Sequence, residues 1–229
     1  MSITTCVFDA YGTLFDVTAA ARQAAGDPAF PQLRDTWARL AADWRTKQLQ
    51  YSWLRAVAQA HTDFWEVTEN ALDWALEVSD QAGDPRLRQH LLDLYWHLAA
   101  YPEVPQMLRD LKQAGMRTAI LSNGSPAMLQ GAVQSAGLGD LLDAVLSVET
   151  VGVFKPDARV YDLVEERFAV TRRDVLFVSS NGWDAGCAAG YGFATAWVNR
   201  AGDPVDRLPW TPDHVLTDLT PIPNLVTTL

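Results

Sequence analysis

The chain has 229 residues, of which 48% are hydrophobic and 20% are charged, and its formal net charge at pH 7 is −10. These values are typical of a globular protein with one large domain, or with a core domain that carries an insertion. The acidic balance argues against nucleic acid or an anionic membrane as a partner, because both require a basic footprint. A small anion is not excluded, since one or two pocket cations would suffice to bind it.

The cysteines and the N-terminus indicate a cytoplasmic protein. Cys6 and Cys187 belong to no CxxC motif or His/Cys cluster, so we interpret both as buried thiols. The N-terminus lacks a basic region followed by an apolar stretch. No apolar run approaches the roughly 20 residues that cross a membrane. We therefore expect a cytoplasmic protein with no membrane partner.

The first strand signal is a short apolar run, Cys6–Phe8, which ends at Asp9 and is followed by a glycine turn. This pattern is typical of a buried parallel strand that carries an acid to the carboxyl edge of a sheet. Open α/β sheets bind their ligands at that edge. The alternative is that Asp9 only caps the next helix.

Residues 15–98 show helical periodicity and no strand signals. Apolar side chains recur at intervals of three and four residues from Leu33 to Ala58, including Leu54, which predicts one face of a long helix. Residues 63–78 and 85–99 predict two more helices, the second opening with an Asp-Pro pair that is typical of a helix start. We therefore expect a helical cap subdomain inserted after the first strand.

Strands and helices alternate in the rest of the chain, which predicts right-handed βαβ units and a doubly wound parallel sheet. The run at 174–180 is apolar on both faces, as in a central strand. Residues 210–223 read as an irregular surface segment with one strand. We expect a Rossmann-like α/β core formed by residues 1–14 and 99–229. The expected strands are 118–122, 144–148, 174–180, 194–199 and 214–217, and the expected helices are 104–114, 126–136, 157–168 and 183–189.

Polar side chains follow four of the predicted strands, at the point where each strand ends. Each group has an ordinary alternative, because such residues also cap helices or lie on the surface. Their position at successive strand ends nevertheless predicts one shared pocket. The groups are Asp9 with Thr13, Ser122 with Asn123, Lys155 with Asp157, and Ser179, Ser180 and Asn181 with Asp184.

These groups match, in order, the four motifs of the haloacid dehalogenase superfamily. Phosphatase members read Asp-x-Asp-x-Thr in the first motif, and the second Asp is their general acid. Here Tyr11 stands in that position, and a phenol with a pKa of about 10 replaces a carboxyl group with a pKa of about 4. Ser180 stands where the phosphatases have an acidic ligand for Mg²⁺, which prefers carboxylate oxygens. The resemblance therefore implies an enzyme without a metal or other cofactor.

Over essentially its whole length the chain resembles one branch, the L-2-haloacid dehalogenases. The Trp-Arg-x-Lys-Gln-Leu run and the Ser-Ser-Asn-x-x-Asp run point specifically to this branch. The resemblance implies hydrolysis of short (S)-2-haloalkanoic acids to (R)-2-hydroxyalkanoic acids, with inversion at C2 and release of halide. The matching segments are residues 8–16, 44–51, 121–126, 155–161 and 177–184.

The resemblance also implies a role for each residue of the site. Asp9 would attack C2 and form an aspartyl ester, and water activated by Asp184 would hydrolyse that ester. Lys155 would keep Asp9 ionised, and Thr13 and Ser179 would orient it. The other expected groups are Asn181 and Tyr161 beside Asp184, Arg45 and Asn123 at the leaving halide, Ser122 and nearby backbone N–H groups at the substrate carboxylate, and Tyr11, Leu49, Phe64 and Trp183 as apolar walls.

Tryptophans are frequent in the predicted cap, at Trp53, Trp65, Trp74 and Trp96. Their excess suggests a second buried surface, and the family resemblance implies a homodimer. The alternative is a monomer whose cap has a tryptophan-rich core. Two other functions stay open, a Mg²⁺-dependent phosphatase of the same fold and a binding protein without activity, because fold alone does not determine function.

Overall fold

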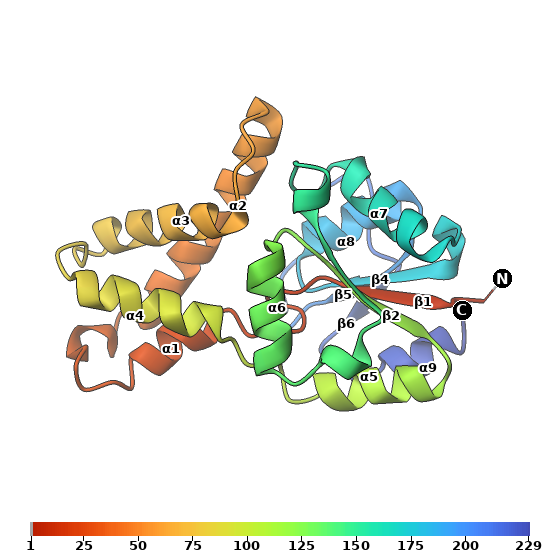
Figure 1. Cartoon of the computed structure of the whole chain (residues 1–229), viewed down its shortest axis with the longest axis horizontal. Coiled ribbons are helices and arrows are strands. Elements are labelled where there is room, and N and C mark those ends of the chain that lie inside the picture. Colours follow the sequence, from red (N-terminus) through yellow and green to blue (C-terminus); the bar gives the residue numbers. More distant parts are fainter. Residues whose placement is uncertain (1) are drawn as a thin grey trace.

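The computed structural model describes residues 2–229, which form a sheet core and a group of helices beside it (Figure 1). The sheet has six strands in the order β3-β2-β1-β4-β5-β6, and every neighbouring pair is parallel. The predicted doubly wound parallel sheet is therefore confirmed. The strands are β1 (Thr5–Phe8), β2 (Arg117–Ser122), β3 (Ala144–Ser147), β4 (Val175–Ser179), β5 (Ala194–Val198) and β6 (His214–Leu216).

The strand order reverses between β1 and β4, which lie side by side at the centre of the sheet. All residues of both strands are buried, as expected for strands covered on both faces. The backbone N–H of Asp9 donates to the Val178 carbonyl at 2.9 Å, so the pairing of β1 with β4 extends to this residue. Asp9 therefore stands at the switch point, where doubly wound sheets form their binding crevice.

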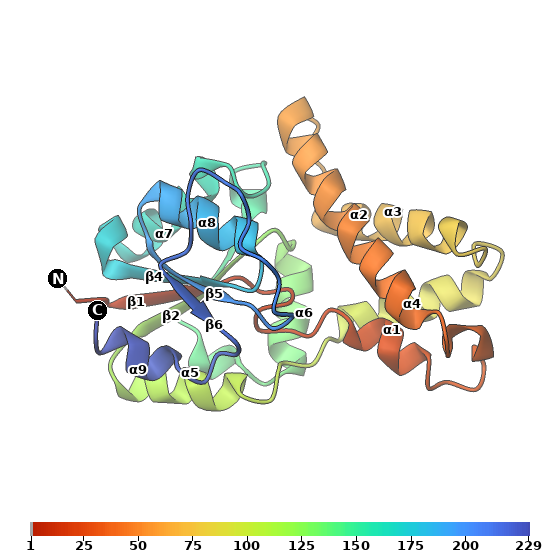
Figure 2. The same cartoon turned by 180° about the vertical axis from the view of Figure 1, so that it is seen from behind.

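Helices cover both faces of the sheet (Figures 1 and 2). α5 (Val104–Gln113) and α9 (Ile222–Val226) lie on one face, and α7 (Ala158–Phe168) and α8 (Gly182–Tyr191) lie on the other. α6 (Pro126–Ser135) packs beside β3. Helix α9 is absent from the sequence prediction, because five residues are too few to show a helical period.

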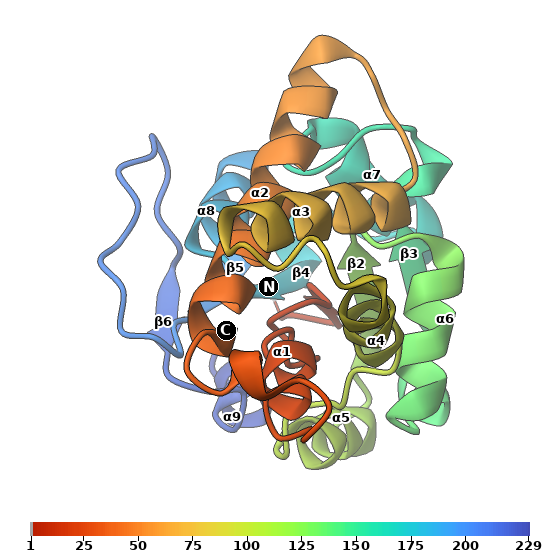
Figure 3. The same ribbon diagram turned by 90° about the vertical axis from the view of Figure 1, so that its left-hand side faces the viewer.

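Four helices form the cap between β1 and β2: α1 (Ala19–Ala24), α2 (Trp37–Ala58), α3 (Phe64–Val78) and α4 (Pro85–Trp96). Figure 3 looks from the cap toward the core and shows these helices in front of the carboxyl ends of the strands. The short, alanine-rich α1 was not predicted, and Leu33 lies in a 3₁₀ turn before α2 rather than in the helix.

Two antiparallel chain segments connect the core to the cap. Phe15 forms a bridge with Ala100, and the Tyr101 N–H donates to the Leu14 carbonyl at 2.9 Å. The crossings lie close to the predicted limits of the insertion, and we propose residues 15–98 as the cap on this basis.

The second half of α2 extends beyond the other cap helices (Figures 1 and 2). Leu54 lies in α2 as predicted, but it is 57% exposed and Val57 is 86% exposed, so the apolar face of this helix is not buried along its whole length. The helix is longer than the surface it packs on, and its periodic apolar face continues past that surface. Although α2 has 22 residues, no helix of the described chain is both long and apolar enough to cross a membrane.

Candidate active site

Asp9 is the centre of the polar groups at the carboxyl edge of the sheet. Its side chain is buried, and its Oδ2 accepts hydrogen bonds from Thr13 Oγ1 at 3.1 Å and Asn181 Nδ2 at 3.0 Å. Its Oδ1 accepts a hydrogen bond from Lys155 Nζ at 3.2 Å. The next helix begins ten residues later, at Ala19, so the alternative that Asp9 is a helix cap is wrong.

Lys155 bridges two buried carboxylates. Its Nζ lies 3.2 Å from Asp9 Oδ1 and 2.8 Å from Asp184 Oδ2, and its side chain is 1% exposed. Burial opposes the ammonium charge, but Asp184 and Asp9 outweigh it and raise the pKa of Lys155 above its usual value. The lysine is therefore held as a cation between the two acids.

Asp184 is fully buried, and the Tyr161 hydroxyl donates to its Oδ1 at 2.8 Å. Burial raises the pKa of Asp184, the charge of Asp9 adds to this, and Lys155 opposes it. Burial and the neighbouring Asp184 hold the pKa of the Tyr161 phenol well above its usual value, so Tyr161 stays a neutral donor. A carboxylate with a raised pKa is a stronger general base than an exposed one.

Two predicted contacts differ in the structure. The Asn181 side chain does not hold Asp184; it bridges Asp9 and Arg45, because Asn181 precedes α8 while Asp184 lies one turn inside that helix. Ser179 does not bond Asp9 in the described residues. Its Oγ accepts the Asn181 backbone N–H at 3.1 Å, a local turn contact at the end of β4. Ser179 thus supports the loop that presents Asn181.

Arg45 enters the site from α2 of the cap. Its Nη2 donates to the Tyr11 carbonyl at 3.0 Å and to Asn181 Oδ1 at 3.3 Å. Periodicity alone could not separate it from Arg39 and Arg55, but these two pair with surface carboxylates. The cap therefore contributes one cation to the pocket of the core.

Ser122 is the last residue of β2 and Asn123 follows it, and both side chains are buried. The Ser122 Oγ accepts the Gly124 N–H at 3.1 Å, which leaves its hydroxyl proton available to a ligand. The Asn123 Oδ1 accepts the Lys155 backbone N–H at 2.9 Å. The amide nitrogen of Asn123 therefore points away from the backbone of Lys155. Both residues can donate to an anion beside Asp9.

Tyr11 belongs to a buried aromatic cluster. Its ring stacks on Tyr95 with a centroid distance of 5.7 Å and lies 6.3 Å from Phe64. A Cβ on Gly124 would lie 2.7 Å from Tyr11 Cε2, so this glycine permits the close approach of the ring. Burial holds the pKa of the Tyr11 phenol well above its usual value, which makes it a poor acid.

Leu49 and Trp183 line a cavity of about 550 Å³, together with Ser180 and Asn181. The Trp183 ring meets Trp53 edge-on at 5.2 Å. These two predicted apolar walls therefore lie where the cavity reaches the polar site through Asn181, whereas Phe64 lies in the buried cluster.

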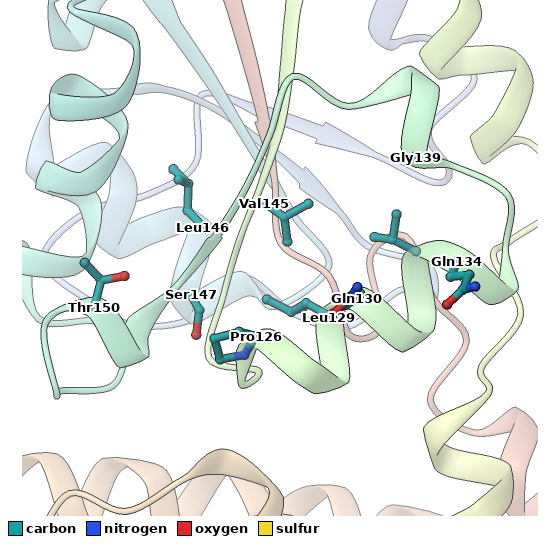
Figure 4. Close-up of a pocket in the computed structure, with 10 residues that line it drawn as sticks. Pro126, Leu129, Gln130, Gln134, Gly139, Val145, Leu146, Ser147 and Thr150 are labelled. Carbon is teal, nitrogen blue, oxygen red and sulfur yellow. The ribbon is translucent and has the colours of Figure 1, made fainter.

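Another cavity, of about 590 Å³, lies between α6 and β3 (Figure 4). Leu129, Val133 and Val145 are among its lining residues, and none of the predicted site residues lines it. This cavity is therefore separate from the candidate site.

Sequence reasoning missed several residues that support the site. One such group is a set of buried polar side chains in the cap, formed by Gln48, Thr68 and Tyr95. The only signal for it in the sequence is the position of Gln48 three residues after Arg45, which brings the two side chains together on one face of a helix. Ser180 is predicted at this edge of the sheet but without an assigned contact; its N–H donates to Thr13 Oγ1 at 2.8 Å and so positions the hydroxyl that holds Asp9. Within residues 2–229, no three His, Cys, Asp or Glu side chains are grouped so as to hold a metal ion.

Residues 3–192 match the family model described as haloacid dehalogenase-like hydrolase. The chain is 43% identical over 221 residues to the (S)-2-haloacid dehalogenase of Pseudomonas sp. (strain YL), covering 96% of this chain and 93% of the relative. It is 46% identical over 194 residues to the enzyme of the same name from Xanthobacter autotrophicus, covering 85% and 74%. The solved L-2-haloacid dehalogenase from Xanthobacter autotrophicus with chloropropionic acid covalently bound superposes with a TM-score of 0.87, at 39% identity and 99% coverage of both chains. The chain therefore belongs to the haloacid dehalogenase-like hydrolases and, among them, to the (S)-2-haloacid dehalogenase family.

Proposed function

We propose that the protein hydrolyses short (S)-2-haloalkanoic acids to (R)-2-hydroxyalkanoic acids, with inversion at C2 and an aspartyl ester on Asp9. The observation that carries this proposal is the buried Asp9, fixed by Thr13, Asn181 and Lys155 beneath Arg45 of the cap. The proposal is supported by the names of the two relatives, both (S)-2-haloacid dehalogenases, and by the solved structure of an L-2-haloacid dehalogenase that holds chloropropionic acid covalently.

In the first step, an Asp9 oxygen attacks C2 from the side opposite the halogen. A new C–O bond forms while the carbon–halogen bond breaks, and the electron pair of that bond leaves with the halide. Arg45 and Asn123 receive the halide as donors, and Ser122 with neighbouring backbone N–H groups binds the substrate carboxylate. The apolar substituent at C2 lies against Tyr11, Leu49, Phe64 and Trp183.

In the second step, water attacks the carbonyl carbon of the ester on Asp9. Asp184 accepts a proton from this water, while Lys155 and Tyr161 hold its two oxygens. The bond between that carbonyl carbon and the ester oxygen then breaks, and the proton passes to the departing alkoxide. One oxygen of Asp9 leaves in the product and the water oxygen replaces it; the second proton of the water is then released to solvent, which restores the Asp9 carboxylate.

The neighbours of Asp9 suit attack on carbon better than phosphoryl transfer. Tyr11 occupies the position of the phosphatase acid with a phenol that stays protonated. Ser180 offers a hydroxyl that is already bonded to Thr13 in place of a carboxylate ligand. The halide leaves with a single negative charge, and two neutral or cationic donors suffice for it, so we propose no metal or other cofactor.

We also propose a homodimer, on a surface that includes Trp53 but not Trp65, Trp74 or Trp96. Trp65 and Trp96 pack edge-to-face at 4.8 Å, and Trp74 lies beneath Lys47 Nζ at 4.2 Å, so packing within the cap accounts for them. Trp53, Leu54 and Val57 are exposed apolar residues that lie close together on the projecting end of α2. Val57→Asp should shift the protein from dimer to monomer in sedimentation equilibrium, and an unchanged mass would refute this surface.

Halide release tests the function directly. With excess EDTA present, (S)-2-chloropropionate should release chloride and the (R) enantiomer should not.

In a single turnover in ¹⁸O-water with excess enzyme, the label should enter Asp9 rather than the product. Activity that requires Mg²⁺, or activity on phosphate esters alone, would indicate the phosphatase, and label found first in the hydroxy acid would show direct attack by water. Asp9→Asn should remain folded and release no halide; a wild-type protein that binds the acid without turnover would be a binding protein.

A further inference from the structure

A buried chain of hydrogen bonds runs through the cap from Arg45 to the backbone of α3. Arg45 Nη1 donates to Gln48 Oε1 at 2.7 Å, and Gln48 Nε2 donates to Thr68 Oγ1 at 2.8 Å. The Thr68 hydroxyl then donates to the Phe64 carbonyl at 2.8 Å. Gln48 and Thr68 are 1% and 0% exposed, so no bulk water competes for these bonds.

The two ends of this chain fix the direction of every bond in it. A guanidinium has only donors, so Arg45 requires the carboxamide oxygen of Gln48. A carbonyl only accepts, so the Phe64 carbonyl takes the single hydroxyl proton of Thr68. The Thr68 oxygen then offers only lone pairs and requires the amide nitrogen of Gln48. Both ends therefore select the same orientation of the Gln48 amide.

Neighbouring groups hold the chain in place. Gln48 Nε2 also lies 3.0 Å from the Tyr95 hydroxyl, which gives both amide protons an acceptor. Trp44 Nε1 donates to the Thr68 carbonyl at 2.9 Å and ties α2 to α3 beside the chain. A fully bonded network of this kind holds a single arrangement, because any rotation leaves a buried polar group without a partner.

We propose that Gln48 and Thr68 are positioning residues that aim the Arg45 guanidinium at the departing halide. This inference rests on the proposed function, in which Arg45 receives the halide. Three of the five N–H donors of Arg45 bond Gln48, Tyr11 and Asn181, which leaves two for an anion. Charge develops on the halogen only as the carbon–halogen bond breaks. A flexible arginine gains little from such a charge, whereas a pre-oriented one stabilises it without reorganisation.

Thr68→Val tests the proposal, because valine keeps the shape of the side chain and removes the hydroxyl. Without that acceptor, one amide proton of Gln48 is left unpaired and only Arg45 still selects the orientation of the amide, so the acceptor of Arg45 is held less firmly. We expect kcat for (S)-2-chloropropionate to fall about tenfold, the factor for one neutral hydrogen bond, with little change in KM. The fall should be smaller for (S)-2-bromopropionate, since bromide leaves more readily and depends less on donors. The ratio of kcat for (S)-2-bromopropionate to kcat for (S)-2-chloropropionate should therefore rise.

Two matched variants separate positioning from loss of stability. Thr68→Ser keeps the hydroxyl and should restore the wild-type ratio of bromide to chloride kcat. Ser52→Ala removes a buried hydroxyl of α2 whose one side-chain bond within the described residues is to the Leu49 carbonyl at 2.8 Å, and it should lower stability without changing the ratio. If Thr68→Val does not fold, Gln48→Glu supports the same comparison, because it keeps an acceptor for Arg45 but presents no donor to Thr68.

Arg45→Gln, measured in parallel, separates failure of this proposal from failure of the proposed function. If Arg45→Gln leaves the bromide-to-chloride ratio unchanged, Arg45 does not receive the halide and the function assigned to it is wrong. If Arg45→Gln raises the ratio while Thr68→Val, or Gln48→Glu in its place, behaves like wild type, the halide role stands and the positioning role is refuted.

Discussion

Replacement of Lys155 by methionine would leave two buried carboxylates without their shared cation. The Nζ lies 2.8 Å from Asp184 and 3.2 Å from Asp9. With an effective dielectric constant of about 20, each contact represents an attraction of about 5–6 kcal/mol, much of which offsets the desolvation of the buried charges. Removal of one partner of such a pair typically costs about 3–5 kcal/mol. We expect Lys155→Met to lower the free energy of unfolding by this amount at pH 7.

The loss should depend on pH in a defined direction. Lys155 lowers the pKa of Asp184, so its removal raises this already elevated pKa further. The folded variant then binds protons more tightly than the unfolded chain, and its stability falls as the pH rises through the range between the two pKa values. The raised pKa of Lys155 itself contributes stability that is fully present below the usual lysine pKa and constant in this range. The deficit of the variant should therefore be largest near neutral pH and shrink toward pH 5.

Urea denaturation at several pH values, with the slope m checked for constancy, measures this loss. Lys155→Met combined with Asp184→Asn removes one of the two uncompensated charges and should recover part of the stability. An exposed ion pair contributes about 1 kcal/mol or less. A decrease in the free energy of unfolding of that size, without dependence on pH, would refute the conclusion that Lys155 neutralises two buried carboxylates. Additive effects of Lys155→Met and Asp184→Asn would show that the two side chains do not interact.

Two further changes address the neighbours of the reacting groups. Tyr161→Phe removes a hydrogen bond that lowers the pKa of Asp184, so the acid limb of the kcat–pH profile should move to higher pH; an unmoved or lowered limb would exclude Asp184 as the base it supports. Gly124→Ala places a Cβ 2.7 Å from Tyr11 Cε2, so it should lower the free energy of unfolding by about 1–3 kcal/mol and raise KM. Gly83→Ala is the control: no heavy atom lies within 4 Å of its Cβ, so neither stability nor KM should change. Equal KM values for these two alanine variants would show that the Tyr11 ring does not shape the pocket.

The sequence predicts the sheet well because buried strands and turn residues are local signals. The apolar run of β4 and the acid after β1 are visible in consecutive residues. The alternation of strands with helices indicates that the strands run parallel to one another. Short elements such as α1 and α9 have too few residues for a period. The exposed end of α2 is a tertiary effect, since nothing in the period of that helix says where its packing partner ends.

The site is predictable in its members and less so in its contacts. Motif positions bring Asp9, Lys155 and Asp184 to one edge of the sheet, and the structure places them within hydrogen-bond distance. The direction in which a side chain points at the end of a strand is set by a few backbone torsions. For that reason the Ser179 hydroxyl turns to its own loop, and the Asn181 side chain bonds the Asp9 carboxylate rather than that of Asp184.

The charges around Asp9 connect the two steps of the proposed reaction. The pocket holds two carboxylates, Asp9 and Asp184, and two cations, Lys155 and Arg45. Attack on C2 moves one negative charge from Asp9 toward the halide beside Arg45 and leaves Lys155 with Asp184 alone. The charge of Asp9 raises the pKa of Asp184, so formation of the ester lowers that pKa. Asp184 therefore becomes more fully ionised in the intermediate, which is the state in which it must accept a proton from water.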